Sequence, residues 1–341
     1  MGPTVQDGSI QWTYIHQVED LPIGWRDEQT PGNYRLNKTD SQNIFDIVHG
    51  PESLKRQTFA PREQLLQIEK TKKGFSVQEN IPQSEQVAIL GVRACDLAGL
   101  TMQDRIFLQD QFPDPYYQAR RQNLFLVAVN CTRAHETCFC ASMGTGPKAE
   151  SGYDLVLTES DQEFLIQGGS PRGEEILESL TVSPAEDLQI QEHDERIAAC
   201  AASQTRKVNQ SSLPQGLYDA HDHRRWDEVA TRCLACTNCT MVCPTCFCHT
   251  VEETPDLTQH TTEHVRVWDS CFTPDHGYIH GKNFRPTIKD RYRMWLTHKM
   301  ASWIDQFGSS GCVGCGRCIT WCPVGIDVTE ELHALLGEKE S

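Results

Sequence analysis

The sequence CLACTNCTMVCP, at residues 233–244, recurs with the same cysteine spacing as CVGCGRCITWCP at residues 312–323. Both stretches follow the pattern C-x2-C-x2-C-x3-C-P, which binds [4Fe-4S] clusters in proteins that hold two of them. In that arrangement the first three cysteines of one copy bind one cluster, and the fourth, before proline, binds the other. The spacing therefore predicts two clusters with crossed ligation.

This rule assigns the eight cysteines to two ligand sets. We expect the first cysteine group to be Cys233, Cys236, Cys239 and Cys322, and the second cysteine group to be Cys312, Cys315, Cys318 and Cys243. Structural zinc is the alternative, but zinc sites use pairs of cysteines and have no need for a third cysteine followed by proline.

A third cysteine group is predicted in the first half of the chain. The apolar runs 87–92 and 124–129 have the length and β-branched composition of buried parallel strands, and each ends at a cysteine-bearing turn. Parallel pairing would bring both turns to one edge of the sheet. The group consists of Cys95, Cys131, Cys138 and Cys140. We predict a third iron-sulfur cluster there, with zinc or plain structural cysteines as alternatives.

Three further cysteines, Cys246, Cys248 and Cys271, form a fourth cysteine group. They either hold another cluster with a fourth ligand that is not cysteine, or line a neighbouring cluster as hydrogen-bond donors. A run C-F-C-H at 246–249 is not the C-x2-C-H pattern of covalent haem attachment. Cys200, between two alanines, is expected to be a buried small residue.

Residues 287–307 show helical periodicity, with an apolar arc that includes Tyr292, Trp295 and Met300. A helix between two cluster motifs is typical of α-helical ferredoxin domains. Lys289, Arg293 and Lys299 lie within or beside this arc, so we expect them to raise a cluster potential by offsetting its negative charge. The alternative is that their stems cover apolar surface while their charged ends reach water.

The remaining patterns predict an α/β (mixed) N-terminal domain ahead of an α-helical two-cluster ferredoxin domain. We expect an irregular N-terminal arm over residues 1–50, an α/β domain with the third group over 51–220, and the ferredoxin-like domain over 221–341. Helices are predicted at 61–73, from Ser183 to about Arg206 and at 222–232, a hairpin at 154–158 and 163–167, and a linker at 209–215.

Composition excludes several classes of protein. The chain has 31 Lys and Arg against 47 Asp and Glu, a net charge of −16, which is unsuited to nucleic acid. No run approaches the roughly 18 apolar residues of a membrane span, and no secretory signal is visible. Sixteen cysteines without such a signal favour metal ligation in the cytoplasm. Dinucleotide and nucleotide-triphosphate motifs are absent, so no residue is assigned a catalytic role.

Several motifs resemble one known family. GVRACDL at 91–97, TCFC at 137–140 with SMGTGP at 142–147, CPTCFC at 243–248 and the stretch 291–299 are similar to the iron-sulfur β subunit of cytoplasmic NiFe sulfhydrogenases. That family is related to the A subunit of anaerobic sulfite reductases. The similarity extends from about Pro51 onward.

The resemblance implies an electron-transfer subunit of a hetero-oligomer, without chemistry of its own. Its expected partners are a NiFe hydrogenase small subunit and a flavin subunit that handles NAD(P)H. The alternatives are the electron-transfer subunit of an anaerobic sulfite reductase, or a subunit that reduces sulfur or polysulfide.

Overall fold

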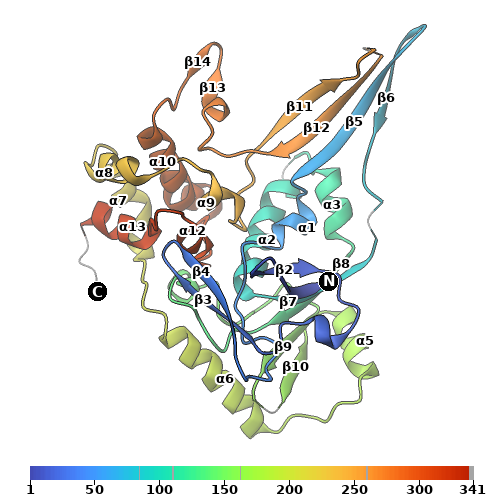
Figure 1. The fold of residues 1–341 in the computed structure, drawn as a ribbon, viewed down its shortest axis with the longest axis vertical. Helices are drawn as coiled ribbons and strands as arrows, with labels where there is room; N and C mark the ends of the chain where they lie inside the picture. Colours follow the sequence, from blue (N-terminus) through green and yellow to red (C-terminus); the bar gives the residue numbers. More distant parts are fainter. Residues whose placement is uncertain (84, 110, 162, 259, 338–341) are drawn as a thin grey trace.

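The computed structural model describes residues 1–83, 85–109, 111–161, 163–258 and 260–337. It is a mixed α/β structure with a helical part near the C-terminus and a long arm of β-strands (Figure 1). The fold class predicted for the first half of the chain is therefore confirmed.

A four-stranded sheet lies at the centre of the first half, in the order β10-β9-β8-β7. The strands are β7 (Val87–Val92), β8 (Leu124–Val129), β9 (Leu155–Glu159) and β10 (Phe164–Gly168). β7, β8 and β9 are parallel, as predicted for the two apolar runs, and β9–β10 is the predicted hairpin. Helices α2 (Ala94–Phe107) and α3 (Pro115–Arg121) connect β7 to β8.

The first 50 residues are more regular than expected. They form two antiparallel hairpins, β1 (Gly2–Gln6) with β2 (Ser9–Thr13) and β3 (Trp25–Thr30) with β4 (Asn33–Lys38), joined by the short helix η1 (Val18–Asp20). The N-terminal amine donates to the carbonyl of Ala88 at 2.6 Å, so the first hairpin packs beside β7. These hairpins were not predicted, because the segment is polar and its strands are only five or six residues long.

The arm is a second four-stranded sheet, in the order β11-β12-β5-β6. Its strands are β5 (Arg62–Thr71), β6 (Gly74–Glu79), β11 (His249–Pro255) and β12 (Thr261–Trp268), and it extends away from the rest of the molecule (Figure 1). The helix predicted over 61–73 is wrong. Backbone pairing with β6 and with the distant β12 overrides the helical spacing of Leu65, Leu66 and Ile68.

The C-terminal part is built around one continuous helical stretch that runs through α10 (Ile288–Thr297), the π-helical turn η4 (His298–Ser302) and α11 (Trp303–Phe307). Tyr292, Trp295 and Met300 are buried in its core, as the apolar arc predicted. Around it lie α7 (Leu213–Asp219), α8 (Arg225–Arg232), α9 (Asn238–Met241), α12 (Arg317–Thr320) and α13 (Val328–Leu336).

Two boundaries differ from the prediction. The helix expected from Ser183 is α6 (Asp187–Ala202), which begins later because Glu186 forms the capping box with Gln189. Residues 209–215 are not a simple linker, since η2 (Gln210–Ser212) and the start of α7 occupy them. The remaining short elements are α1 (Lys55–Thr58), α4 (Cys140–Met143), α5 (Pro171–Ser179), η3 (Asp275–Gly277), β13 (Tyr278–Ile279) and β14 (Lys282–Asn283).

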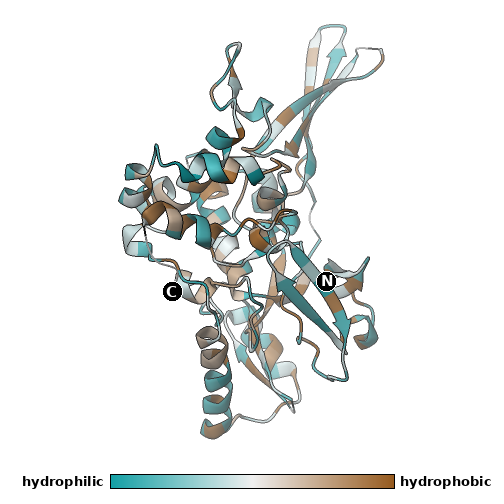
Figure 2. Cartoon of the chain, turned by 60° about the vertical axis from the view of Figure 1, so that its left-hand side comes forward, coloured by the Kyte–Doolittle hydropathy of each residue, from teal (hydrophilic) through white to brown (hydrophobic). Residues whose placement is uncertain are grey.

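Hydrophobic residues are not confined to the core. Figure 2 shows hydrophobic segments among the hydrophilic ones along the arm, and Phe75, Val77, Val251 and Leu257 are exposed there. No helix among the described residues is long and apolar enough to cross a membrane.

Candidate iron-sulfur centres

The first cysteine group surrounds a cavity at the surface of the helical part. Cys233, at the end of α8, and the other three predicted ligands all line it, together with the rings of Phe272, Tyr292 and Trp295. The loop bends sharply because Ala235 and Thr237 have positive φ angles of 49° and 70°. Backbone N–H groups point at the thiols: Ala235 N lies 3.4 Å from Cys233 Sγ, and Ile326 N lies 3.3 Å from Cys322 Sγ.

In the second cysteine group, Cys312 and Cys315 are buried, and Cys318 and Cys243 are partly buried. Burial raises the pKa of Cys318 well above its usual value, and nearby Cys312, Cys315 and Cys243 raise it further. The four predicted thiols therefore lie near one another. Gly314 N donates to Cys312 Sγ at 3.4 Å, and Lys299 Nζ donates to Cys243 Sγ at 3.5 Å.

The third cysteine group also comes together as predicted. Cys95, at the start of α2, and the other three thiols are buried and line one cavity, at the carboxyl ends of β7 and β8. Two donors reach its sulfurs: Arg93 Nη1 lies 3.8 Å from Cys131 Sγ, and Gln204 Nε2 lies 3.3 Å from Cys140 Sγ. Burial raises the pKa of Cys140 to about 12, so this thiol needs a cation before it ionises.

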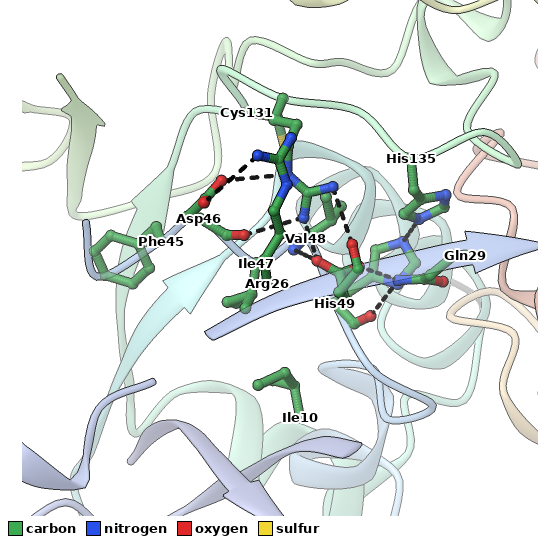
Figure 3. Close-up of polar contacts among 12 residues, drawn as sticks. Ile10, Arg26, Gln29, Phe45, Asp46, Ile47, Val48, His49, Cys131 and His135 are labelled. Atoms are coloured by element: carbon green, nitrogen blue, oxygen red, sulfur yellow. Dashed lines mark hydrogen bonds and ion pairs between the residues drawn. The ribbon is translucent and has the colours of Figure 1, made fainter. Parts of the chain in front are cut away.

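Two histidines that the sequence did not single out support this third cavity. His135 Nε2 lies 3.3 Å from Cys138 Sγ and 3.3 Å from His49 Nε2, and His49 Nε2 lies 2.9 Å from the carbonyl oxygen of Cys315. Figure 3 shows His135 beside His49, with the chain from Phe45 to His49 near Cys131. Burial lowers the pKa of His135 to about 3, so its ring is neutral and serves as a hydrogen-bond partner.

The spacing of the thiols favours clusters over single zinc ions. Four ligands on one zinc lie about 3.8 Å apart, since a Zn–S bond is about 2.3 Å long. Within the described part of the chain, one set of three His, Cys, Asp or Glu ligand atoms lies within 4.8 Å of one another, namely His49, His135 and Cys138. Among the described residues, no three thiols of one cysteine group are that close, and a larger cofactor suits their wider spacing.

A buried cation gives independent support for a negatively charged cofactor. Arg317 is fully buried, and its Nη2 donates to Asp96 Oδ2 at 2.9 Å, while its Nη1 has no hydrogen-bond partner among the described residues. Cys315 and Cys95 both lie close enough to raise the pKa of this guanidinium. An unpartnered buried donor beside these thiols fits an anionic cluster.

The three predicted tuning cations have different positions. Lys299 is buried against Cys243, and its Nζ also donates to Thr245 Oγ1 at 2.7 Å and to the carbonyl of Gly311 at 3.1 Å. Lys289 instead pairs with Asp227 at 2.9 Å, and Arg293 donates to the carbonyl of His221 at 3.0 Å. Neither of these two contacts is with a thiol.

Lys55 is a further buried cation that sequence reasoning missed. Its Nζ lies 3.9 Å from the centre of the Trp268 ring and donates to the carbonyls of Thr240 and Met241. Burial lowers its pKa to about 8, although nearby Cys246 and Cys243 oppose that shift. Nothing in the local sequence of Lys55 indicates this position, because it depends on chain more than 180 residues away.

The fourth cysteine group lines an open cavity between η4 and the base of the arm, with His276, His298 and Arg285 in the same wall. The Cys248 thiol contacts Cys271 and His276, and these contacts lower its pKa to about 4. Cys246 lies next to Cys243 of the second group. The predicted Cys200 is buried in α6, as expected, and lines the third cavity.

Comparison with known proteins gives two matches. Residues 232–326 match the family described as a 4Fe-4S dicluster domain. The chain is also 35% identical over 305 residues to sulfhydrogenase 2 subunit beta of Pyrococcus furiosus, an alignment that covers 86% of each chain. No solved structure matches.

The residues matched by the dicluster domain contain the first, second and fourth cysteine groups. The resemblance drawn from the motifs is thereby confirmed, as is the expectation of iron-sulfur clusters. This chain belongs to the family of sulfhydrogenase β subunits, iron-sulfur proteins of electron transport.

Proposed function

We propose that this chain relays electrons between a NiFe hydrogenase module and a flavin module that handles NAD(P)H, through three [4Fe-4S] clusters held by the first, second and third cysteine groups. When bound, such a cluster takes up and releases one electron at a time. The sulfhydrogenase name of the relative favours a hydrogenase assembly over a sulfite reductase.

One observation supports the relay above all others: the second cysteine group borders both of the other cavities. Cys318 lines the cavity of the first group, and Cys315 lines the cavity of the third. The three groups therefore form an unbroken row from the buried thiols of the third cavity to the surface around Cys236, which is exposed. A protein that only bound metal for stability would have no need of such a row.

The protein supplies charge compensation along this row. Arg317 lies between the third and second groups, Lys299 lies against the second, and Arg291 lies near Cys233 of the first. Each offsets the negative charge that a cluster with four thiolates brings into a buried site. This placement also supports the α-helical ferredoxin-like nature of the C-terminal part, since all three cations are on its helices.

The relay is tested by removing one proposed ligand of the third group, so that electrons can no longer pass through it. In the anaerobically purified complex, Cys138→Ser should lose about four irons per chain and abolish H2-dependent reduction of NAD(P)+. Hydrogen oxidation with a viologen dye, and dye reduction by NAD(P)H, should both persist because each uses one module only. Cys200→Ser is the matched control, since Cys200 lines the same cavity without being a proposed ligand. Loss of iron with full NAD(P)+ reduction would contradict the relay.

A further inference from the structure

The fourth cysteine group is a set of potential metal ligands that the three-cluster row does not use. Cys246 and Cys248 follow Pro244 in the loop before β11, and Cys271 follows β12. The base of the arm therefore brings them together: β11 and β12 pair so that His249 lies opposite Trp268, close to both cysteine-bearing ends.

A histidine completes the set to four side chains. His276, in η3, lines the same cavity as the three thiols and contacts Cys248. Its Nδ1 lies 2.8 Å from Asp269 Oδ2, which leaves Nε2 as the ring nitrogen available to a ligand. A metal-binding histidine is usually oriented by a hydrogen bond from its other ring nitrogen, and a carboxylate is one of the partners that do this.

Asp269 is itself held in place. Its Oδ1 accepts hydrogen bonds from Ser270 N at 2.7 Å and from Thr273 Oγ1 at 2.6 Å. The carboxylate, the imidazole and the thiol of Cys248 thus form a preorganised chain of contacts. If these side chains served only to pack the protein interior, they would fill the space beside them. That space is instead an open cavity, so the arrangement favours a binding site.

We propose that Cys246, Cys248, Cys271 and His276 bind a fourth [4Fe-4S] cluster, with three thiolate ligands and one imidazole. The inference rests on the proposed relay and extends it by one site. The four ligand atoms are not mutually within 4.8 Å, which is wider than the spacing on a single tetrahedral ion. Arg285 and Lys299 line the same cavity and supply positive charge for an anionic cofactor.

The position of this site defines its role. Cys246 contacts Cys243, a ligand of the second group, so the fourth site branches from the middle of the row and not from its end. The fourth cavity is more open than the third, which is lined mostly by buried residues. The fourth site would therefore give the row a second point of electron exchange, apart from the surface around Cys236.

The test measures iron, zinc and acid-labile sulfide in the anaerobically purified full chain. We expect about sixteen irons per chain, and a loss of about four in Cys248→Ser and in Cys271→Ser. His298→Gln is the control, because His298 lines the same cavity and is not a proposed ligand. It should leave the iron content unchanged. A full complement of iron in Cys248→Ser, or the loss of zinc in place of iron, would overturn the proposal.

A second variant separates ligation from packing. His276→Cys should keep all sixteen or so irons but shift one reduction potential to a lower value, since replacing cysteine by histidine on iron raises it. Redox titration followed by electron paramagnetic resonance measures this shift. Unchanged potentials would overturn histidine ligation. None of the variants at Cys248, Cys271 and His276 changes a residue of the third group. The relay is therefore tested independently, by Cys138→Ser.

Discussion

At the scale of single residues, Lys299 couples protein charge to redox chemistry. Burial alone lowers the pKa of this ammonium, but the nearby Cys243 and Cys246 outweigh it, so its pKa lies well above the usual value. Lys299 is therefore charged at neutral pH. We expect it to stabilise the more negative, reduced form of the cluster proposed for the second group.

The substitution Lys299→Met should consequently lower the potential of that cluster. The shift is expected to be on the order of 60 mV, which corresponds to a tenfold change in the equilibrium of a one-electron couple. Redox titration with paramagnetic resonance measures it. Lys289→Met is the matched control, because Lys289 pairs with Asp227 at the surface. A similar shift in both variants would show that the effect is not local.

The sequence predicts three tuning cations, and one of them, Lys299, contacts a thiol in the structure. The difference between Lys299 and the other two has a physical reason. Helical periodicity places Lys289, Arg293 and Lys299 near one apolar arc, but the π-helical turn η4 changes the angular position of the residues within it. Lys299 lies in that turn and faces inward, while the other two precede it. Lys55 and Arg317 were missed because their partners come from distant parts of the chain.

At the scale of elements, two loops interlock where the second and third groups meet. Phe139 N donates to the carbonyl of Gly314 at 2.9 Å, and Thr137 Oγ1 lies 2.7 Å from Thr320 Oγ1. Gly314 has a φ of +62°, and a Cβ added there would lie 2.6 Å from the backbone of Phe139. The close approach of the two cluster loops therefore requires glycine.

Gly314→Ala should reduce the iron bound by both loops, since the loops must separate to admit a methyl group. Gly308→Ala is the control: its φ of +71° is as unusual, but a Cβ there meets nothing within 4 Å. The control carries only the left-handed backbone cost of about 1–2 kcal/mol. Iron analysis and thermal unfolding of the two variants give the comparison. Equal losses would mean that backbone strain, and not the loop contact, is responsible.

Element prediction succeeded where the signal was local and failed where it was not. The apolar strands β7 and β8 and the helix over 288–307 follow from periodicity in their own residues. β5 was taken for a helix because its partner β12 begins some 190 residues later, and no local pattern encodes that pairing. His49 lies 86 residues before His135 in the sequence, which explains why it was not connected to the third group.

At the scale of the whole molecule, the arm joins the two halves of the chain. β12, from the C-terminal part, pairs with β5 from the first half, and Arg266 lies opposite Glu63. Arg266 Nη2 donates to Glu63 Oε2 at 2.6 Å, and both side chains are almost fully buried. The expected boundary between residues 220 and 221 therefore separates two segments that share one sheet.

Glu63→Gln should destabilise the whole protein by about 3 kcal/mol, because it leaves the buried Arg266 with one fewer anion. The matched control is Glu252→Gln, which removes the exposed pair with Arg62 in the same arm and should cost less than about 1 kcal/mol. Thermal unfolding of the anaerobic protein provides the measurement. If both variants unfold at the same temperature, the buried pair does not hold the halves together.

The burial of the thiols in the third cavity predicts an order of maturation. Its four thiols are each at most 9% exposed, and Cys315, from the C-terminal half, forms part of its wall. The third cavity is thus lined by buried thiols, whereas Cys236 of the first group is exposed at the surface. We therefore expect the proposed third cluster to be inserted while the newly made chain is still open, whereas the proposed cluster of the first group can be inserted in the finished protein.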